Sequence, residues 1–223
     1  MTAIQVKSVP LPPVDFAEIL RYAACRDTDR EVLQLARWAA AEAESCLHGR
    51  VCWQETDVSI RNDTVYLGGA AFPSKKLTER LTGCNRAVVF AATVGLELDR
   101  LIARYGHLAP AKGLMLQSLG SERIEALCDC FETETAAYYA AEGTRPRYSP
   151  GYGDLPLESQ REIFDMLECP KRIGLYLSGS FQMTPSKSVT AIIGIGGKVD
   201  TQTHCRACSQ KDCAYRRETI CLF

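Results

Sequence analysis

The sequence predicts an α+β protein. Two amphipathic helical segments open the chain, short stretches rich in β-branched residues begin near residue 50, and a long helical stretch precedes the last strands. Helices and strands are mixed without the regular βαβ alternation of a doubly wound parallel sheet. The order of elements therefore favours an α+β fold.

The first 49 residues are predicted to form an N-terminal helical region. Residues 9–13 are rich in proline and indicate an extended lead-in, and residues 15–24 show helical spacing of apolar residues. A second helix follows, because Thr28 and Glu31 have the spacing of a capping box. Apolar residues recur at helical spacing after it: Val32, Leu35, Ala36, Ala39, Ala40 and Ala43. The two segments predict a helical hairpin.

The β-rich part begins with three short strands predicted at residues 51–54, 58–60 and 64–67. The turn-forming sequence 61–63 separates the last two strands and predicts a hairpin. Ser74 is predicted to cap a short helix that reaches Leu81 and stops at Gly83. Residues 87–91 follow as a buried strand, since they are apolar and rich in valine.

The longest predicted element is a helix over residues 110–141. Pro110 suits its first turn, and Gly120 inside it indicates a kink or a close approach to another backbone. A shorter helix is predicted before it, at residues 96–105, and another after it, at 158–167. Between the last two helices lies a loop rich in glycine and proline, residues 143–155, and strands are predicted at 173–177 and 189–195.

Composition excludes several classes of protein. The 223 residues include 26 Lys and Arg against 27 Asp and Glu, and no long run of either sign provides a surface for nucleic acid. Nowhere do about 18 apolar residues follow one another, and residues 1–13 lack the apolar run of a signal peptide. We therefore expect a cytoplasmic protein without a membrane partner. Of the eleven cysteines, seven are scattered and are predicted to be free thiols, mostly buried.

Several well-known site motifs are missing. The sequence Gly194-Ile-Gly-Gly-Lys198 resembles a phosphate loop, but Ile192 and Val199 occupy positions where a Walker loop requires Gly and Ser or Thr. No dinucleotide fingerprint, nucleophile elbow or His-Glu-x-x-His helix is found. None of the three histidines lies two residues after an aspartate, so the corrinoid-ligand motif Asp-x-His-x-x-Gly is also missing.

The loop Arg147-Tyr-Ser149-Pro150-Gly151-Tyr152 has the composition of a site for a small zwitterion. A guanidinium binds a carboxylate through two parallel hydrogen bonds, glycine lets a ligand approach the backbone, and a tyrosine ring covers an apolar part. On composition alone an ordinary Pro-Gly turn with an ion-paired arginine remains the more frequent alternative.

Arg147, Gly151 and Tyr152 match an Arg-x-x-x-Gly-Tyr motif, and Met183-x-Pro185-x-x-Ser188-Val189 follows downstream. In these motifs the chain resembles the activation domain of cobalamin-dependent methionine synthase, over about residues 114–195. The resemblance implies a twisted antiparallel sheet with flanking helices. It also implies binding of S-adenosylmethionine by Arg147, Ser149, Pro150, Gly151 and Tyr152, with Glu125 on the long helix in a supporting position.

The chain departs from that family in places. Residues 153–157, Gly-Asp-Leu-Pro-Leu, replace the family's Cys-Pro-Asp-His, and no aromatic residue occurs between Lys198 and His204, where the family has an aromatic pair. The family's N-terminal aspartate that contacts the ligand has no clear counterpart. These departures favour a second interpretation, a docking module that keeps the motif for its fold alone.

A cysteine cluster ends the chain: Cys205, Cys208, Cys213 and Cys221, with His204 adjacent. Cys-x-x-Cys lets two thiolates reach one metal, and Cys213 with either Cys221 or His204 would complete a four-ligand shell. The spacing is neither that of a paired zinc ribbon nor that of a bacterial ferredoxin, so zinc and an iron–sulfur cluster both remain open. A redox dithiol, direct contact with a corrinoid and unliganded thiols are further alternatives.

Together these observations predict three regions: residues 1–49, an activation-domain-like core at 50–198 and a cysteine-rich tail at 199–223. The resemblance implies a reactivation partner for a cobalamin-dependent methyltransferase of the methionine synthase type. In that role the protein binds S-adenosylmethionine for reductive methylation of Co(II) cobalamin carried by a separate corrinoid protein, with a donor such as flavodoxin or ferredoxin supplying the electron. The alternatives are docking without S-adenosylmethionine, or electron transfer by an iron–sulfur cluster in the tail.

Overall fold

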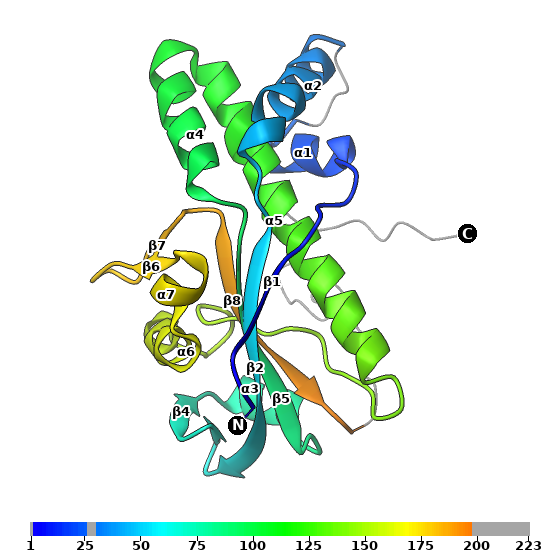
Figure 1. Ribbon diagram of the computed structural model, residues 1–223, viewed down its shortest axis with the longest axis vertical. Helices are drawn as coiled ribbons and strands as arrows, with labels where there is room; N and C mark the ends of the chain where they lie inside the picture. Colours follow the sequence, from blue (N-terminus) through cyan, green and yellow to red (C-terminus); the bar gives the residue numbers. More distant parts are fainter. Residues whose placement is uncertain (1, 26–29, 198–223) are drawn as a thin grey trace.

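The computed structural model describes residues 2–25 and 30–197 of the chain. A long helix, α5 (Pro110–Tyr138), runs along one face of a curled sheet and extends beyond it, where other helices pack on it, and short helices lie against the opposite face (Figure 1). Every strand pair in the described part of the chain is antiparallel, which confirms the predicted α+β class. The predicted capping box at Thr28 lies outside the described residues.

Strand β2 (Arg50–Arg61) organises the sheet. Its first four residues lie between β1 and β5, and its last four residues pair with β3, which gives the order β4-β3-β2-β5-β8 with β1 beside β2. The other strands are β1 (Gln5–Ser8), β3 (Thr64–Leu67), β4 (Ala70–Pro73), β5 (Arg86–Thr93) and β8 (Ser188–Ile195). The two pieces predicted at 51–54 and 58–60 are thus one strand that changes partners.

Each face of the sheet buries its own apolar core. Along β5, Val88 and Phe90 contact one core while Val89 and Ala91 contact the other, as strand alternation requires. The first core receives α5, α1 (Phe16–Tyr22), α2 (Arg30–Ala43) and α4 (Leu96–Leu108). The second receives α3 (Lys75–Leu81), α6 (Gln160–Leu167) and α7 (Cys169–Ile173).

Local signals in the sequence set several element ends. Asp15 caps α1 by accepting hydrogen bonds from the amides of Ala17 and Glu18, and the Ser74 hydroxyl accepts from Leu77 at the start of α3, as predicted. Asn62 and Asp63 both have positive φ and form the turn of the predicted hairpin. Short 3-10 turns lie at Glu44–Cys46 and Leu157–Ser159.

The strand predicted at residues 173–177 is wrong for most of its length. Helix α7 occupies Cys169–Ile173, and only β6 (Tyr176–Leu177) is extended, pairing with β7 (Met183–Thr184). The reason is visible in the sequence, since Pro170 suits a first helical turn and Gly174, with φ of 69°, provides a left-handed helix end.

Gly120 marks a close approach by side chains, whereas a kink or the approach of another backbone was expected there. The helix runs unbroken across this position. A Cβ atom on Gly120 would lie 2.9 Å from Leu98 Cδ2 on α4 and 2.9 Å from Lys187 Cγ. The missing side chain therefore lets α4 and the Lys187 side chain reach the surface of α5.

The contact between α4 and α5 provides a matched pair of glycine substitutions. A Cβ on Gly113 would lie 2.8 Å from the Cα of Gly106 on α4, whereas a Cβ on Gly106 meets nothing within 4 Å. Gly113→Ala should therefore destabilise the protein by about 1–3 kcal/mol, because the two helix backbones must move apart. Gly106→Ala should stabilise it by about 0.5–1 kcal/mol through helix propensity. Denaturant unfolding of both variants tests this, and equal effects would contradict the close approach.

Candidate functional site

The predicted ligand loop follows α5 and first runs along the edge of β8. The amide of Arg145 donates to Gly194 O at 2.9 Å, and Tyr148 and Ile192 exchange two backbone hydrogen bonds of 2.9 Å. These bonds extend the sheet by a short irregular strand. The neighbouring side chains of Arg147 and Tyr148 point to opposite faces of the sheet, as in an extended strand.

Arg147 points toward α5, opposite to the buried ring of Tyr148. Its Nη2 lies 2.9 Å from Glu125 Oε2 and its Nη1 lies 2.7 Å from Asp129 Oδ1, while Glu132 accepts from both the side chain and the main-chain amide. Residues 125, 129 and 132 are spaced by four and three, so one face of α5 presents all three carboxylates. Only 14% of the Arg147 side chain is exposed.

The electrostatics of this cluster keep Arg147 charged. Burial disfavours a charged guanidinium, but the carboxylates around it outweigh that effect and hold the pKa of Arg147 above its ordinary value. Burial in the same region raises the pKa of the Cys128 thiol. Three carboxylates against one guanidinium leave the cluster with an excess of negative charge, so it favours a ligand that carries positive charge.

The rest of the loop closes on itself. Tyr152 N donates to Ser149 O, Leu155 N donates to Tyr152 O, and Gly151 N donates to Leu155 O at 2.9 Å. Gly151 has φ of 86°, a conformation that glycine adopts without strain. Pro150 is buried, Ser149 is half-buried and the Tyr152 side chain is 62% exposed, so a ligand beside the loop would meet the tyrosine from solvent.

Asp154 fastens the loop to α3. Its carboxylate accepts hydrogen bonds from the Ser74 hydroxyl and from the amides of Lys75 and Lys76. The bond from Lys75 N is 2.9 Å long. Gly153 has no room for a side chain, because the Tyr148 hydroxyl and the Lys76 side chain lie against it. The departure from the family sequence at residues 153–157 thus supplies an anchor for the loop.

The anchor predicts a pH dependence. The hydrogen bond from Ser74, followed by those from the backbone, lowers the pKa of Asp154. A carboxylate with a lower pKa in the folded state stabilises the fold above its unfolded pKa of about 3.9, and that contribution is lost as the pH falls through the folded pKa. Asp154→Asn should lower Tm by about 2–4 °C at neutral pH and by less under acid conditions. Asp165→Asn, at an exposed site on α6, is the control and should leave Tm unchanged. If Asp154→Asn lowers Tm by the same amount at neutral and at acid pH, the ionised Asp154 carboxylate is not what anchors the loop.

The structure brings together part of the predicted site. Arg147 and Glu125 form an ion pair, and Ser149, Pro150, Gly151 and Tyr152 lie in one turn. Asp129 and Glu132 are functional candidates that the sequence reasoning missed. Their spacing from Glu125 on a predicted helix was the available signal.

The predicted metal ligands Cys205, Cys208, Cys213 and Cys221 lie outside the described residues, as does His204. Within residues 2–25 and 30–197, no group of three or more His, Cys, Asp or Glu side chains is arranged to hold a metal ion. Nor does any helix in that part of the chain have the length and apolar character needed to cross a membrane.

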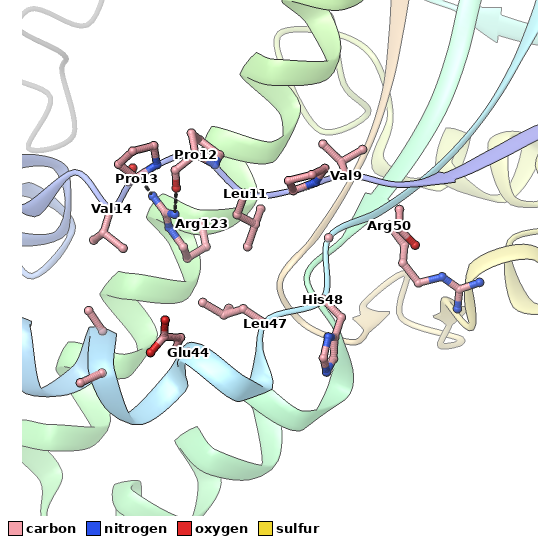
Figure 2. A pocket seen from close by; sticks show the side chains of 15 residues that line it. Val9, Leu11, Pro12, Pro13, Val14, Glu44, Leu47, His48, Arg50 and Arg123 are labelled. Carbon is pink, nitrogen blue, oxygen red and sulfur yellow. Dashed lines mark hydrogen bonds between the residues drawn. The ribbon is translucent and has the colours of Figure 1, made fainter.

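A separate open groove of about 1200 Å³ lies on another side of α5. Figure 2 shows the proline-rich strap of residues 8–14 along one wall, with Leu47 and His48 opposite and the Arg123 guanidinium bonded to the carbonyls of Pro12 and Pro13. Arg123 and Glu125 are two residues apart, about 200° around the helix, so this groove and the Arg147 cluster use different faces.

Comparison with known proteins identifies a family and a similar fold. A family model described as vitamin B12 dependent methionine synthase, activation domain, matches residues 79–204, which include the acidic face of α5 and the Arg147 loop. No curated protein sequence matches. Among solved structures, the chain is similar to the "Crystal Structure of the MetH Reactivation Domain bound to AdoHcy", with a TM-score of 0.63 and 16% identity over 86% of this chain and 78% of that chain. At this identity the likeness supports the fold, a curled antiparallel sheet with flanking helices.

Proposed function

The chain belongs to the family of activation domains of vitamin B12-dependent methionine synthase, and on that premise we propose that it binds S-adenosylmethionine beside the Arg147 loop. The observation that carries the proposal is the Arg147 cluster, in which a largely buried guanidinium is paired with three carboxylates of one α5 face. The loop that carries Arg147 also presents the exposed Tyr152. The solved relative bound to AdoHcy supports a ligand of this chemical type.

The residues present fit such a ligand. S-adenosylmethionine carries one anionic group, the carboxylate, and two cationic groups, the ammonium and the sulfonium. A site for it therefore requires one positively charged side chain and can contain several negatively charged ones. Arg147 would bind the carboxylate, in competition with its own partners on α5, and the acidic face of α5 would stabilise the two cationic groups. Tyr152 would cover an apolar part of the ligand, and Gly151 would let it approach the backbone.

The proposed role is reactivation of a cobalamin-dependent methyltransferase. S-adenosylmethionine supplies the methyl group when bound, the cobalamin belongs to a separate corrinoid protein, and a donor such as flavodoxin or ferredoxin supplies the electron. The task of this chain is to bind and orient the methyl donor, which agrees with the scarcity of histidine in the sequence. No general base is required of it.

A second candidate is a docking module that binds the corrinoid protein without S-adenosylmethionine. The observation that favours it is that the Arg147 guanidinium already forms ion pairs with three carboxylates. In that case the arginine fixes the loop to α5 and contributes to the fold alone.

The cysteine tail is proposed to hold zinc or an iron–sulfur cluster through Cys205, Cys208, Cys213 and Cys221. Metal analysis and visible absorbance of anaerobically purified protein distinguish the two. An iron–sulfur cluster would support electron transfer by this chain, and metal-free protein that keeps its activity would remove the proposal.

Calorimetric titration of the anaerobically purified protein with S-adenosylmethionine tests the proposed function. We expect saturable binding that weakens at high salt, because opposite charges hold the ligand. A titration with S-adenosylhomocysteine, which lacks the sulfonium charge, should give weaker binding. If neither ligand binds, alone or with a corrinoid protein present, the docking function replaces the proposed one.

A further inference from the structure

Lys187 lies just before the last strand, against the same helix as the Arg147 cluster. It precedes β8, and its main-chain carbonyl accepts a hydrogen bond from the amide of Val94 at 3.2 Å. Its side chain extends over Gly120, since a Cβ atom there would lie 2.9 Å from both Cγ and Cε of Lys187. The ammonium donates to the hydroxyl of Ser121 at 3.0 Å. The packing therefore fixes a cation at a defined place on α5.

Ser121 belongs to the helix face that carries the Arg147 cluster. Residues 121, 125, 129 and 132 are spaced by four, four and three, so their side chains form one stripe along α5. All four residues are half-buried. Arg147 Nη2 reaches Glu125, whose position is roughly 6 Å from that of Ser121 along the helix axis. The Lys187 ammonium therefore lies about one helical turn beyond the Arg147 cluster.

Unlike Arg123 and Arg147, Lys187 forms no ion pair with any acidic residue in the described part of the chain. The nearby Asp99 carboxylate instead accepts hydrogen bonds from the amide and the hydroxyl of Ser186, at 2.6 and 2.7 Å. Burial lowers the pKa of Lys187, and the charge of Asp99 acts in the opposite direction. An anion placed at the Lys187 ammonium would therefore stabilise its charged form.

We propose that Lys187 is a second binding residue for the carboxylate of S-adenosylmethionine, which it holds together with Arg147. This inference rests on the proposed function. The Arg147 guanidinium is shared among three carboxylates of α5, so an incoming carboxylate must compete with them for it. Lys187 contributes a positive charge without such competitors. Its ammonium has three donors, of which one is directed at Ser121, so donors remain for a ligand.

The assignment orients the ligand along the stripe on α5. The carboxylate lies toward the Ser121 end, next to both cations. The ammonium and the sulfonium lie toward Asp129 and Glu132, where negative charge is in excess. A ligand without a carboxylate offers Lys187 no anion, and the lysine charge then repels its cationic groups. Lys187 therefore selects ligands that carry the carboxylate.

Calorimetric titration of wild type and Lys187→Gln with two ligands tests the inference. One ligand is S-adenosylmethionine, and the other is its decarboxylated form, which keeps the amine and the sulfonium. We expect Lys187→Gln to weaken binding of S-adenosylmethionine about 10-fold, the effect of losing one hydrogen bond to a charged group. Binding of the decarboxylated ligand should be unchanged or tighter, because the variant removes a repelling charge. Glutamine keeps a polar group that can bond to Ser121.

The control is Lys171→Gln, which makes the same charge change at a 72% exposed side chain on α7, on the other face of the sheet. It should bind both ligands like the wild type, and Lys187→Arg should recover most of the affinity for S-adenosylmethionine. Equal weakening of both ligands in Lys187→Gln would indicate a structural role and overturn the inference, as would unchanged binding of S-adenosylmethionine. If the wild type binds neither ligand, the proposed function itself fails and this inference fails with it.

Discussion

Replacing Arg147 with alanine is expected to weaken S-adenosylmethionine binding by about 30-fold or more. Loss of one partner from a desolvated charge pair costs at least about 2 kcal/mol, which is a factor of that size. The loss has two sources, because the ligand's carboxylate loses its cation and three carboxylates of α5 are left to repel one another. Arg147→Lys should recover part of the affinity, since it restores the charge without the planar fork.

The control for this experiment is Arg145→Ala. Arg145 lies in the same loop segment, and its Nη2 contacts Thr82 O at 3.4 Å, away from the acidic face of α5. The two variants change the net charge equally, so a difference in affinity between them reports the local role of Arg147. Circular dichroism and unfolding of each variant check the fold. If both bind like the wild type, Arg147 serves the fold alone and S-adenosylmethionine binds elsewhere on the chain.

Much of the fold was predictable because its signals are local. Buried strands such as β5 and β8 are continuous apolar runs, and Ser74 and Gly83 mark the ends of α3. Strand β1 was missed because it is exposed over most of its length, and β4 was missed because its sequence, Ala-Ala-Phe-Pro, contains no β-branched residue. Their formation depends on β2 and β3 as partners, and such pairing between distant segments leaves little trace in a single sequence.

The site was predictable to a smaller extent. The Arg-x-x-x-Gly-Tyr motif identified the loop, and helical spacing placed Glu125 near it, a pairing that the structure contains. Arg147 points toward α5 because backbone hydrogen bonds hold this loop against β8. These bonds join distant parts of the chain, so no local sequence pattern predicts them. Asp129 and Glu132 were missed for this reason, since their role depends on which face of α5 meets the loop.

The largest effect on stability is expected at Arg123, whose side chain is 2% exposed. It forms an ion pair with Glu122 and donates to the carbonyls of Pro12 and Pro13, while Glu122 accepts from the amide of Asp15 at 3.1 Å. Arg123→Met should destabilise the protein by about 3–5 kcal/mol, because it leaves a buried carboxylate without its partner. For a chain of this size the fall in Tm is about 10 °C.

Two further variants separate the buried charge from simple loss of packing. Adding Glu122→Gln to Arg123→Met should recover part of the stability, since the amide oxygen still accepts from Asp15 and no charge remains buried. Arg172→Met removes an exposed helical ion pair with Glu168 and should cost less than about 1 kcal/mol. If the double variant is no more stable than Arg123→Met, the bonds to the two proline carbonyls dominate. In either case Arg123 holds the strap of residues 8–14 on α5, and the wall of the groove in Figure 2 depends on it.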